Sequence, residues 1–410
     1  MPRRYSFQII LFLFLGFSSG LPLALTSSTL QFWYQTAGFS LVSLGLLSLL
    51  GQPYTFKFLW APLMDRFAWL AWGRRRGWML FTQMMIILLL IVMALLEPQH
   101  HPLLLGCVAL ATAFFSASQD IAVDAYRTDS LSSEEVGLGN ALYTAGYRIA
   151  MLVSGGVVLI LAGISGFQVM YGVMAGLMLI GVVATLLAKE PICKRTPVSL
   201  REAVVNAFSV FFQKPMAWFL VLFVFFYKLS DAFSLSLLGP FLIRTLHLTL
   251  QELGVMYKTV GLISTLVGVF LGGFYLKRLG YYRALLYFGF LQALTGLFFI
   301  ALIYVEKNYF LLITTIALEN ITSGLGTIAF LSFLMNLCDH RYTATQFALL
   351  TSLSTIGRVY IGPLAGLIAE YFGWMNYFLI GFLLCFPGLF LLYFIRNKVE
   401  WPFATKKEHL

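Results

Sequence analysis

The sequence predicts an all-α, polytopic membrane protein with twelve transmembrane helices in two pseudo-symmetric six-helix halves. Three observations lead to this prediction: a very apolar composition, twelve apolar segments of membrane-spanning length, and an internal repeat. Of the 410 residues, 60% are hydrophobic and only 11% are charged, and the mean hydropathy is +0.86. A chain of this composition needs lipid as its solvent.

The apolar segments have the length that a bilayer requires. A hydrocarbon core about 30 Å thick needs about 20 apolar residues per helix. Such windows, separated by breaks rich in Gly, Pro and charge, occur at 6–34, 40–63, 78–96, 102–126, 139–163, 167–188, 216–243, 251–275, 283–304, 308–337, 342–369 and 374–396. The first follows Arg3 and Arg4 without a clear cleavage pattern, so we expect a transmembrane helix rather than a signal peptide.

The basic residues predict the orientation of these helices. The formal net charge is +10, and 20 of the 27 Lys and Arg residues fall on one side of the predicted helices. Only Arg244 and Lys307 fall on the other side. Cytoplasmic loops are rich in Lys and Arg, so both termini are expected in the cytoplasm. Nucleic-acid binding is the weaker explanation of the charge.

Matched spacings reveal the internal repeat. Asp129 and Arg148 are 19 residues apart, as are Asp339 and Arg358, and the two pairs are offset by 210 residues. Nearly the same offset places 40–45 beside 249–254. Two parallel six-helix halves of this kind are the arrangement of major facilitators, which bind substrate near the bilayer midplane between the halves.

The repeat also predicts the domain organisation, with an N-terminal half at 1–190 and a C-terminal half with a short cytoplasmic tail at 216–410. The linker at 191–215 contains Ser199 and Glu202 in the S-x-x-E spacing of a capping box. An apolar stripe follows, which favours an amphipathic cytoplasmic helix over a disordered linker.

Charged residues lie inside the predicted helices, where each costs at least ~2.5 kcal/mol at the helix centre. They are Lys57, Asp120, Asp124, Arg148, Lys228, Asp231, Lys258, Glu319 and Arg358. The third, sixth, ninth and twelfth helices carry none in their interiors, with Arg283 and Arg396 only at the ends of the last two. This distribution is typical of a transporter in which those four helices are peripheral and the others surround an aqueous path.

Three embedded carboxyl groups are candidates for proton coupling. Asp120 and Asp124 are one helical turn apart, so they share a face of the fourth helix. Like charges that close favour the protonated form of one of them. We expect Asp124 to be the more sensitive of the two, with Glu319 as the fallback carrier in the second half. Static pairing of the aspartates with Arg148 or Lys57 is the alternative.

Five embedded cations outnumber the four embedded acids, which predicts an anionic substrate. Lys57, Arg148, Lys228 and Arg358 are therefore substrate-binding candidates, together with Asp231. Lys258 is expected to snorkel to water. Lys228 and Asp231 are spaced to pair with each other instead.

Two further features of the predicted helices each have a functional and a purely structural explanation. Trp33 and Tyr34 are substrate-binding candidates that could stack on sugar rings, although such aromatics more often form an interface belt. Breaker residues in the first and seventh helices could expose backbone groups to a cavity or simply bend the helix for packing. These breakers are Gly20, Pro22, Gly239 and Pro240.

The segments 61–67 and 73–76 resemble the loop signature of major facilitators, in which Asp-Arg and a Gly-led basic run brace the cytoplasmic gate. The resemblance departs at Ala61, where the signature begins with Gly, and at an insertion over 68–72. It implies a cytoplasmic gate formed with the repeat acids, from Asp65, Arg66, Arg74, Arg75, Asp129 and Asp339.

Several motifs together resemble the AmpG-type muropeptide permeases. These motifs lie at 20–26, 56–60, 116–121, 146–148, 227–233, 344–350 and 357–360. The resemblance implies proton-coupled import of N-acetylglucosaminyl-1,6-anhydro-N-acetylmuramyl peptides across the inner membrane, for cell-wall recycling and the linked induction of beta-lactamase. It adds Gln119 to the substrate-binding candidates. The implied partners are an anionic glycopeptide, protons and membrane lipids, with no metal, cofactor or nucleic acid, and a monomeric state.

Other functions stay open at this point. The transporter could carry another anionic solute, such as acetyl-CoA or a sugar conjugate. A membrane-embedded acyltransferase is the alternative from another class, and it needs a His with an acidic or nucleophilic companion. The five histidines all fall in predicted loops or tails without such company, at His100, His101, His247, His340 and His409. A transporter that is not an enzyme is therefore expected.

Overall fold

The computed structural model describes residues 7–39, 47–68, 73–132, 134–191, 199, 201–214, 216–238, 241–242, 245–248, 259–305 and 308–398. Within these ranges, the side chains of residues 48, 203, 357–359 and 362–363 are not described. Some predictions therefore lie outside the described residues: the repeat segments 40–45 and 249–254, Gly239, Pro240, Lys258 and the side chain of Arg358.

The chain forms two compact units, each considered by itself. Unit 1 comprises Met1–Glu135, Leu142–Phe208 and Cys338–Leu349, and unit 2 comprises Val136–Ala141, Ser209–Leu337 and Leu350–Leu410. Each unit thus includes a short segment from the other half of the sequence.

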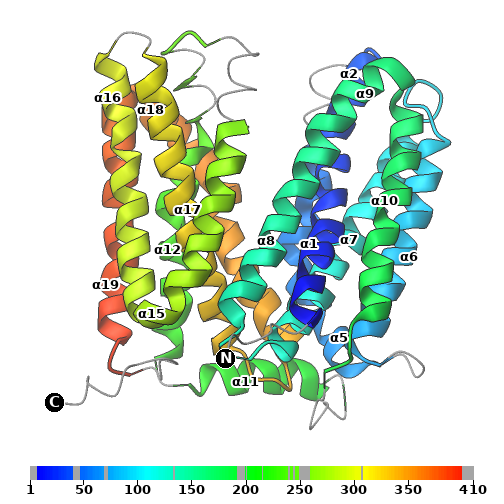
Figure 1. The fold of residues 1–410 in the computed structure, drawn as a ribbon, viewed down its shortest axis with the longest axis horizontal. Helices are drawn as coiled ribbons and strands as arrows, with labels where there is room; N and C mark the ends of the chain where they lie inside the picture. Colours follow the sequence, from blue (N-terminus) through cyan, green and yellow to red (C-terminus); the bar gives the residue numbers. More distant parts are fainter. Residues whose placement is uncertain are drawn as a thin grey trace. The chain divides into compact units, whose positions relative to one another are not determined.

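Unit 1 is built from helices that pack along one another (Figure 1). They are α1 (Phe7–Leu25), α2 (Ser28–Thr36), η1 (Leu47–Gly51), α4 (Gln52–Phe56), η2 (Lys57–Leu59), α5 (Ala61–Arg66), α6 (Arg75–Ala94), α7 (Pro102–Ser130), most of α8 (Val136–Leu152), η3 (Val153–Val157), α9 (Val158–Ser165), α10 (Phe167–Leu187) and η4 (Glu202–Asn206). Helix α6 contacts both α7 and α10, and α1 also contacts both. Buried apolar side chains from these helices form the core.

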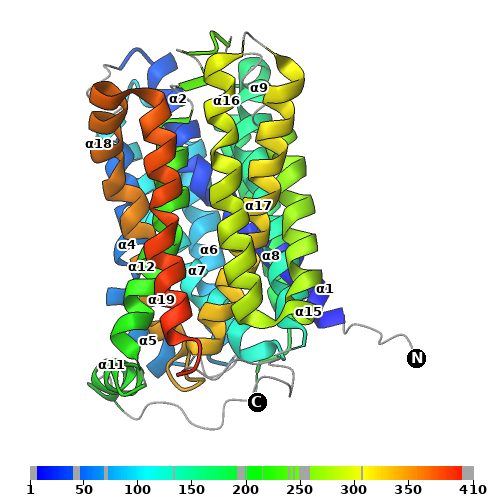
Figure 2. The same cartoon turned by 90° about the vertical axis from the view of Figure 1, so that its left-hand side faces the viewer.

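Unit 2 has the same all-helical character. Its helices are most of α11 (Ala207–Phe212), α12 (Ala217–Ser236), α15 (Gly261–Gly296), α16 (Phe298–Tyr304), α17 (Tyr309–Leu337), most of α18 (Thr343–Leu383) and α19 (Cys385–Ile395). Helices α15 and α17 run side by side in both views (Figures 1 and 2). Helix α11 lies across the direction of α12 (Figure 1). Before it, the Glu202 N–H donates to Ser199 Oγ over 3.1 Å, as one half of the predicted capping box.

Nine helices among the described residues are long and apolar enough to cross a membrane. This number is smaller than twelve partly because α15 and α18 each join two predicted helices at a glycine. Gly280 has φ 73° and Gly373 has φ 75°, a left-handed conformation that glycine adopts without steric cost. Each of the twelve predicted segments contains helix in its described part, so the predicted all-α membrane fold is confirmed.

The second predicted helix differs from the expectation of one continuous span at 40–63. Over residues 47–66 it consists of four short helical pieces, from η1 to α5. Proline stands in the first turn of both α4 and α5, at Pro53 and Pro62. Proline favours a helix start but removes a hydrogen-bond donor from a helix interior, so the helix restarts at each one. This irregular backbone places Lys57 beside α7.

Glycines allow α1 and α8 to cross at backbone contact. A Cβ atom on Gly146 would lie 1.9 Å from the carbonyl oxygen of Leu13, and one on Gly20 would lie 2.5 Å from that of Tyr147. Gly20 therefore serves close packing. The break between α1 and α2 follows Pro22 instead, whose carbonyl accepts hydrogen bonds from the N–H and hydroxyl of Thr26.

Candidate functional site

A buried ion-pair cluster joins the loop before α6 to the end of α7. The guanidinium of Arg75, 1% exposed, lies 3.0 Å from Asp65 Oδ1, and its Nε donates to Asp129 Oδ2 over 2.7 Å. Arg74 Nη2 lies 3.7 Å from the same Asp129 oxygen. One arginine thus bridges two carboxylates that are distant in sequence, where a buried charge needs such partners.

The start of α18 docks onto this cluster within unit 1. The N–H groups of Ala344 and Thr345 donate to the two carboxylate oxygens of Asp65 over 3.1 and 2.8 Å. Thr343 Oγ1 donates to Asp129 Oδ1 over 2.7 Å. The free N–H groups of a helix start favour an anion. Asp65 therefore caps α18 from another segment of the chain.

The other gate candidates differ in whether they contact this cluster. Arg74 also donates to the backbone oxygen of Asp65. The Arg66 guanidinium lies 5.5 Å from the ring centre of Phe67. Asp339 forms an ion pair with Arg341 at 2.8 Å. The cluster that holds α18 is thus made by Asp65, Arg74, Arg75 and Asp129.

Sequence reasoning missed Glu190 at this cluster. Its carboxylate accepts the N–H groups of Arg75 and Arg76 over 2.8 and 3.0 Å, which caps the start of α6. A Cβ on Gly73 would lie 2.5 Å from the Glu190 carboxyl carbon. The Gly-led basic run was a signal for this site, but no spacing pointed to an acid at the end of α10.

A second charged cluster lies inside unit 1 around Asp124. Asp124 Oδ1 accepts a hydrogen bond from Arg127 Nη2 over 2.8 Å, and its Oδ2 lies 3.6 Å from Lys57 Nζ. All three residues are buried, at 7%, 1% and 8% exposure. The structure therefore contains the ion pair between Asp124 and Lys57 that the sequence suggests as the alternative to proton coupling. The prediction that the fourth helix ends at residue 126 is wrong, because α7 continues to Ser130 and buries Arg127.

Asp120 lies one turn before Asp124 in a different environment. It is 8% exposed, and its Oδ1 has no hydrogen-bond partner among the described residues. Buried atoms on neighbouring helices share this property within the described part of the chain. Near Asp120 they are Ser19 Oγ of α1, Tyr54 OH of α4 and, on α7 itself, Ser116 Oγ, and the adjacent Gln119 Oε1 on α7 also lacks a described partner. Because buried polar atoms almost always have partners in native proteins, this group has the capacity to bind water or a polar ligand.

The other predicted residues of unit 1 have varied surroundings. Gln119 Nε2 donates to Ser18 Oγ over 3.0 Å. Arg148 of α8 is half-buried. Trp33 is buried, with its ring 5.6 Å from that of Phe167, and the Tyr34 hydroxyl donates to a backbone oxygen of Pro102. Both aromatic side chains therefore have a packing role in the core.

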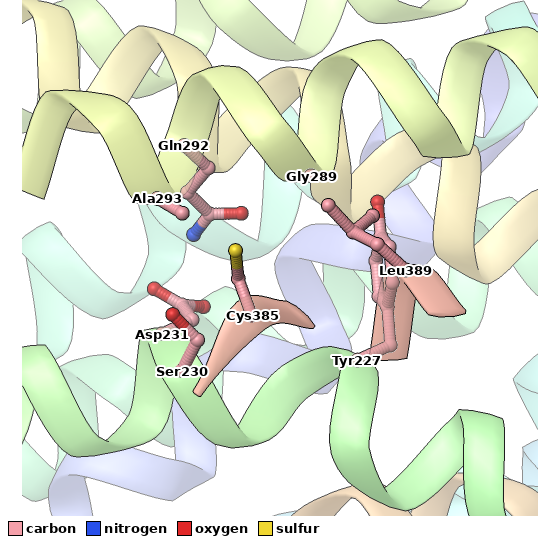
Figure 3. Close-up of a pocket in the computed structure, with 8 residues that line it drawn as sticks. All are labelled: Tyr227, Ser230, Asp231, Gly289, Gln292, Ala293, Cys385 and Leu389. Atoms are coloured by element: carbon pink, nitrogen blue, oxygen red, sulfur yellow. The ribbon is translucent and has the colours of Figure 1, made fainter. Parts of the chain in front are cut away.

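Unit 2 contains its own polar site. Lys228 Nζ lies 3.4 Å from Asp231 Oδ2 and 3.3 Å from Thr327 Oγ1, so the expected pairing of Lys228 with Asp231 is present. Figure 3 shows the Gln292 amide facing the Asp231 carboxylate across a small cavity of about 10 Å³, which has room for one water molecule. Asp231 Oδ1 and Gln292 Nε2 lack other partners in the described ranges. Glu319 of α17 is buried.

The fold and these sites define a multi-pass membrane transporter, in which buried charges line helices of membrane-spanning length. Comparisons with known proteins agree. The family model described as Major Facilitator Superfamily matches residues 9–362. The chain is 45% identical over 391 residues to the anhydromuropeptide permease of Escherichia coli (strain K12), which covers 95% of this chain and 80% of that relative. It is 32% identical over 397 residues to a putative transporter AmpG 4 of Rickettsia felis, covering 94% and 96%.

Solved structures show the same fold at low identity. The Escherichia coli fucose:proton symporter FucP gives a TM-score of 0.72 at 14% identity, covering 94% of this chain and 97% of that chain. The proton:xylose symporter XylE gives 0.75 at 10% identity, covering 96% of both. The chain belongs to the major facilitator superfamily and, within it, to the AmpG-type family of muropeptide permeases. It is a transporter and not an enzyme.

Proposed function

We propose that this protein imports anhydro-muropeptides together with protons. The substrates are N-acetylglucosaminyl-1,6-anhydro-N-acetylmuramyl peptides, which move from periplasm to cytosol for cell-wall recycling. The name of the Escherichia coli relative supports this substrate. A ligand of this kind carries sugar hydroxyls and amides at one end and peptide carboxylates at the other, so it needs both hydrogen-bonding groups and cations.

The observation that carries the proposal is the polar group around Asp120. Ser19, Ser116 and Gln119 offer buried atoms without other described partners, which suits the hydroxyl and amide groups of a sugar. Lys57 and Arg127 add two positive charges within the same unit. Sugar-binding and carboxylate-binding groups are therefore available close together.

Charge balance offers a mechanism for coupling. With both aspartates ionised, the charges of Lys57 and Arg127 are balanced by Asp120 and Asp124. When Asp120 binds a proton, the cluster carries one excess positive charge, and an anionic substrate compensates for it. Each ligand thereby favours binding of the other, as reciprocal coupling requires. We propose Asp120 as the proton carrier, ahead of Asp124, because two cations already stabilise the Asp124 carboxylate.

The second half of the chain is proposed to contribute both substrate-binding residues and an alternative proton carrier. Lys228, Asp231 and Arg358 are proposed to contact substrate, and Glu319 is the alternative proton carrier. The proposed domains are two six-helix halves, 1–190 and 216–410, with 191–215 as the cytoplasmic linker. We place the protein as a lipid-embedded monomer in the inner membrane, with both termini in the cytoplasm, on the basic residues of its loops.

Uptake into proteoliposomes tests the proposal. Purified protein is reconstituted, and a labelled anhydro-muropeptide is supplied outside at acidic pH with a more alkaline interior. Accumulation that is abolished by a protonophore and by excess unlabelled substrate is expected. Excess acetyl-CoA and the corresponding non-anhydro muropeptide serve as competitors of different chemistry. Accumulation of acetyl-CoA in place of the anhydro-muropeptide would overturn the substrate assignment.

A further inference from the structure

Arg127 is a buried arginine that the proposed transport cycle uses only as one of two positive charges. It lies in α7 one turn after Asp124 and is 1% exposed. Its guanidinium carbon sits 3.9 Å from the ring centre of Tyr143. The Nη2 atom donates to Asp124, whereas Nε and Nη1 have no hydrogen-bond partner in the described part of the chain. This arginine is thus directed at a single carboxylate.

The two aspartates of α7 differ mainly in this contact. Asp124 has Arg127 at 2.8 Å and Lys57 at 3.6 Å, one cation on each oxygen. Thr128 Oγ1 also bonds the Asp124 backbone oxygen, which fixes this turn of the helix. Asp120 has an oxygen without a partner among the described residues. In a low-dielectric interior, opposite charges favour the ionised carboxylate, whereas desolvation favours the neutral acid.

We propose that Arg127 is a positioning residue that keeps Asp124 ionised and so assigns the exchangeable proton to Asp120. This inference rests on the proposed proton coupling and deepens it. Arg127 acts through Asp124 and need not touch substrate. Without the guanidinium, Asp124 would retain only the longer contact to Lys57, and the two aspartates would compete for one proton.

The groups that face this pair come from four segments of unit 1. Ser19 lies on α1, Tyr54 on α4, Lys57 on η2, and Tyr143 and Tyr147 on α8. Only Lys57 and Arg127 among these facing residues of the described structure are cations. Both cations lie against Asp124, and their charges also act on Asp120. The assignment of the proton therefore depends on how these two charges divide between the aspartates.

Infrared spectroscopy tests the assignment on the purified full-length protein without substrate. The carbonyl stretch of a protonated carboxyl group is followed during a pH titration. The wild-type band is expected to vanish in Asp120→Asn. In Asp124→Asn, Lys57 and Arg127 lose their shared carboxylate and both stabilise ionised Asp120, so the band should appear only at a lower pH than in the wild type. In Arg127→Gln, a protonated-carboxyl band is expected to survive the added Asp120→Asn change, because Asp124 then takes the proton. The Asp124→Asn/Arg127→Gln double variant should regain the wild-type titration.

Matched variants separate this role from packing. Arg278 of α15 also lies over an aromatic ring, 4.5 Å from the centre of Phe274, but is exposed and belongs to unit 2. Arg278→Gln should leave the band unchanged. Should Arg127→Gln fail to fold, Arg127→Lys keeps the positive charge, and its combination with Asp120→Asn should show no band.

Two results would overturn the inference: a wild-type band that survives Asp120→Asn, or no band in Asp120→Asn/Arg127→Gln. A band in Asp120→Asn/Arg127→Lys would likewise contradict it. Because the measurement needs no substrate, failure of anhydro-muropeptide uptake would refute the proposed substrate and leave this result standing.

Discussion

At the scale of single residues, the two aspartates of α7 have the same chemistry and unlike surroundings. Asp124 lies between Lys57 and Arg127, whereas Asp120 Oδ1 has no partner in the described residues. Carboxylates of different environment divide the roles of fixed charge and proton carrier. The expectation from sequence that Asp124 is the more sensitive to substitution is therefore revised in our proposal.

The first prediction concerns this division. Asp120→Asn is expected to abolish gradient-driven accumulation of substrate while exchange of internal for external substrate remains measurable, because exchange needs no net proton cycle. Asp124→Asn is expected to weaken both activities, since it leaves Lys57 and Arg127 without their shared carboxylate. Both activities are measured in proteoliposomes at equal protein content. If Glu319→Gln alone removes accumulation, the coupling site belongs to the second half.

The sequence predicted which residues carry buried charge but not which of them meet. An acid or base inside an apolar run is expensive, so its presence alone identified Lys57, Asp120 and Asp124. Arg127 was assigned to a loop because the apolar run fades before it, although α7 continues to Ser130. Glu190 meets Arg75 and Arg76 through the backbone. A contact to the backbone does not depend on the type of the donating residue, so it produces no recognisable motif in the sequence.

At the scale of helices, small residues decide how closely α1 and α8 approach. The carbonyl oxygen of Leu13 occupies the place that a Gly146 side chain would take, at 1.9 Å. No rotamer change relieves a contact with backbone, so the helices would have to separate. The prediction of a breaker at Gly20 rested on residue type alone, which cannot distinguish bending from close packing.

The second prediction tests this crossing. Gly146→Ala is expected to destabilise the protein by about 1–3 kcal/mol, the usual cost of overpacking. Gly176→Ala, in α10, is the matched control, because its new Cβ would have no atom within 4 Å. Thermal unfolding in detergent measures both. Equal melting temperatures for the two variants would show that α1 and α8 are not in backbone contact.

The start of α18 has a pH-sensitive contact beside its carboxylate cap. His340 Nδ1 lies 3.5 Å from Asp129 Oδ1, and this hydrogen bond raises the pKa of His340 above its usual value. A raised histidine pKa stabilises the docked state below the ordinary value of about 6.5, and that stabilisation is lost as the pH rises through the raised value. The effect is small, since the His340 side chain is 74% exposed.

The third prediction follows from that sign. At about pH 5, His340→Gln is expected to speed hydrogen exchange at the Ala344 and Thr345 amides relative to wild type, whereas at about pH 8 the two proteins should match. His101→Gln, in an exposed loop of the same unit, should match wild type at both values. A difference for His340→Gln that grows as the pH rises would contradict the assignment.

At the scale of the whole molecule, composition and repetition were enough to predict the fold. Apolar windows located the helices because each must satisfy its backbone within the bilayer. The breaks inside them were harder to predict, since a proline start and a glycine turn at Gly280 or Gly373 depend on local backbone geometry. Val136–Ala141 belongs to unit 2 and Cys338–Leu349 to unit 1. Nothing in the sequence of these two segments indicates the unit to which each belongs.

The central claim is that an anionic muropeptide and a proton cross the membrane together. Its most direct test is to add anhydro-muropeptide to proteoliposomes in weak buffer, with no imposed gradient, and to record the external pH with a dye. We predict a transient alkalinisation outside that accompanies substrate entry and is absent with Asp120→Asn protein. Entry of substrate without any change in external pH would contradict the account.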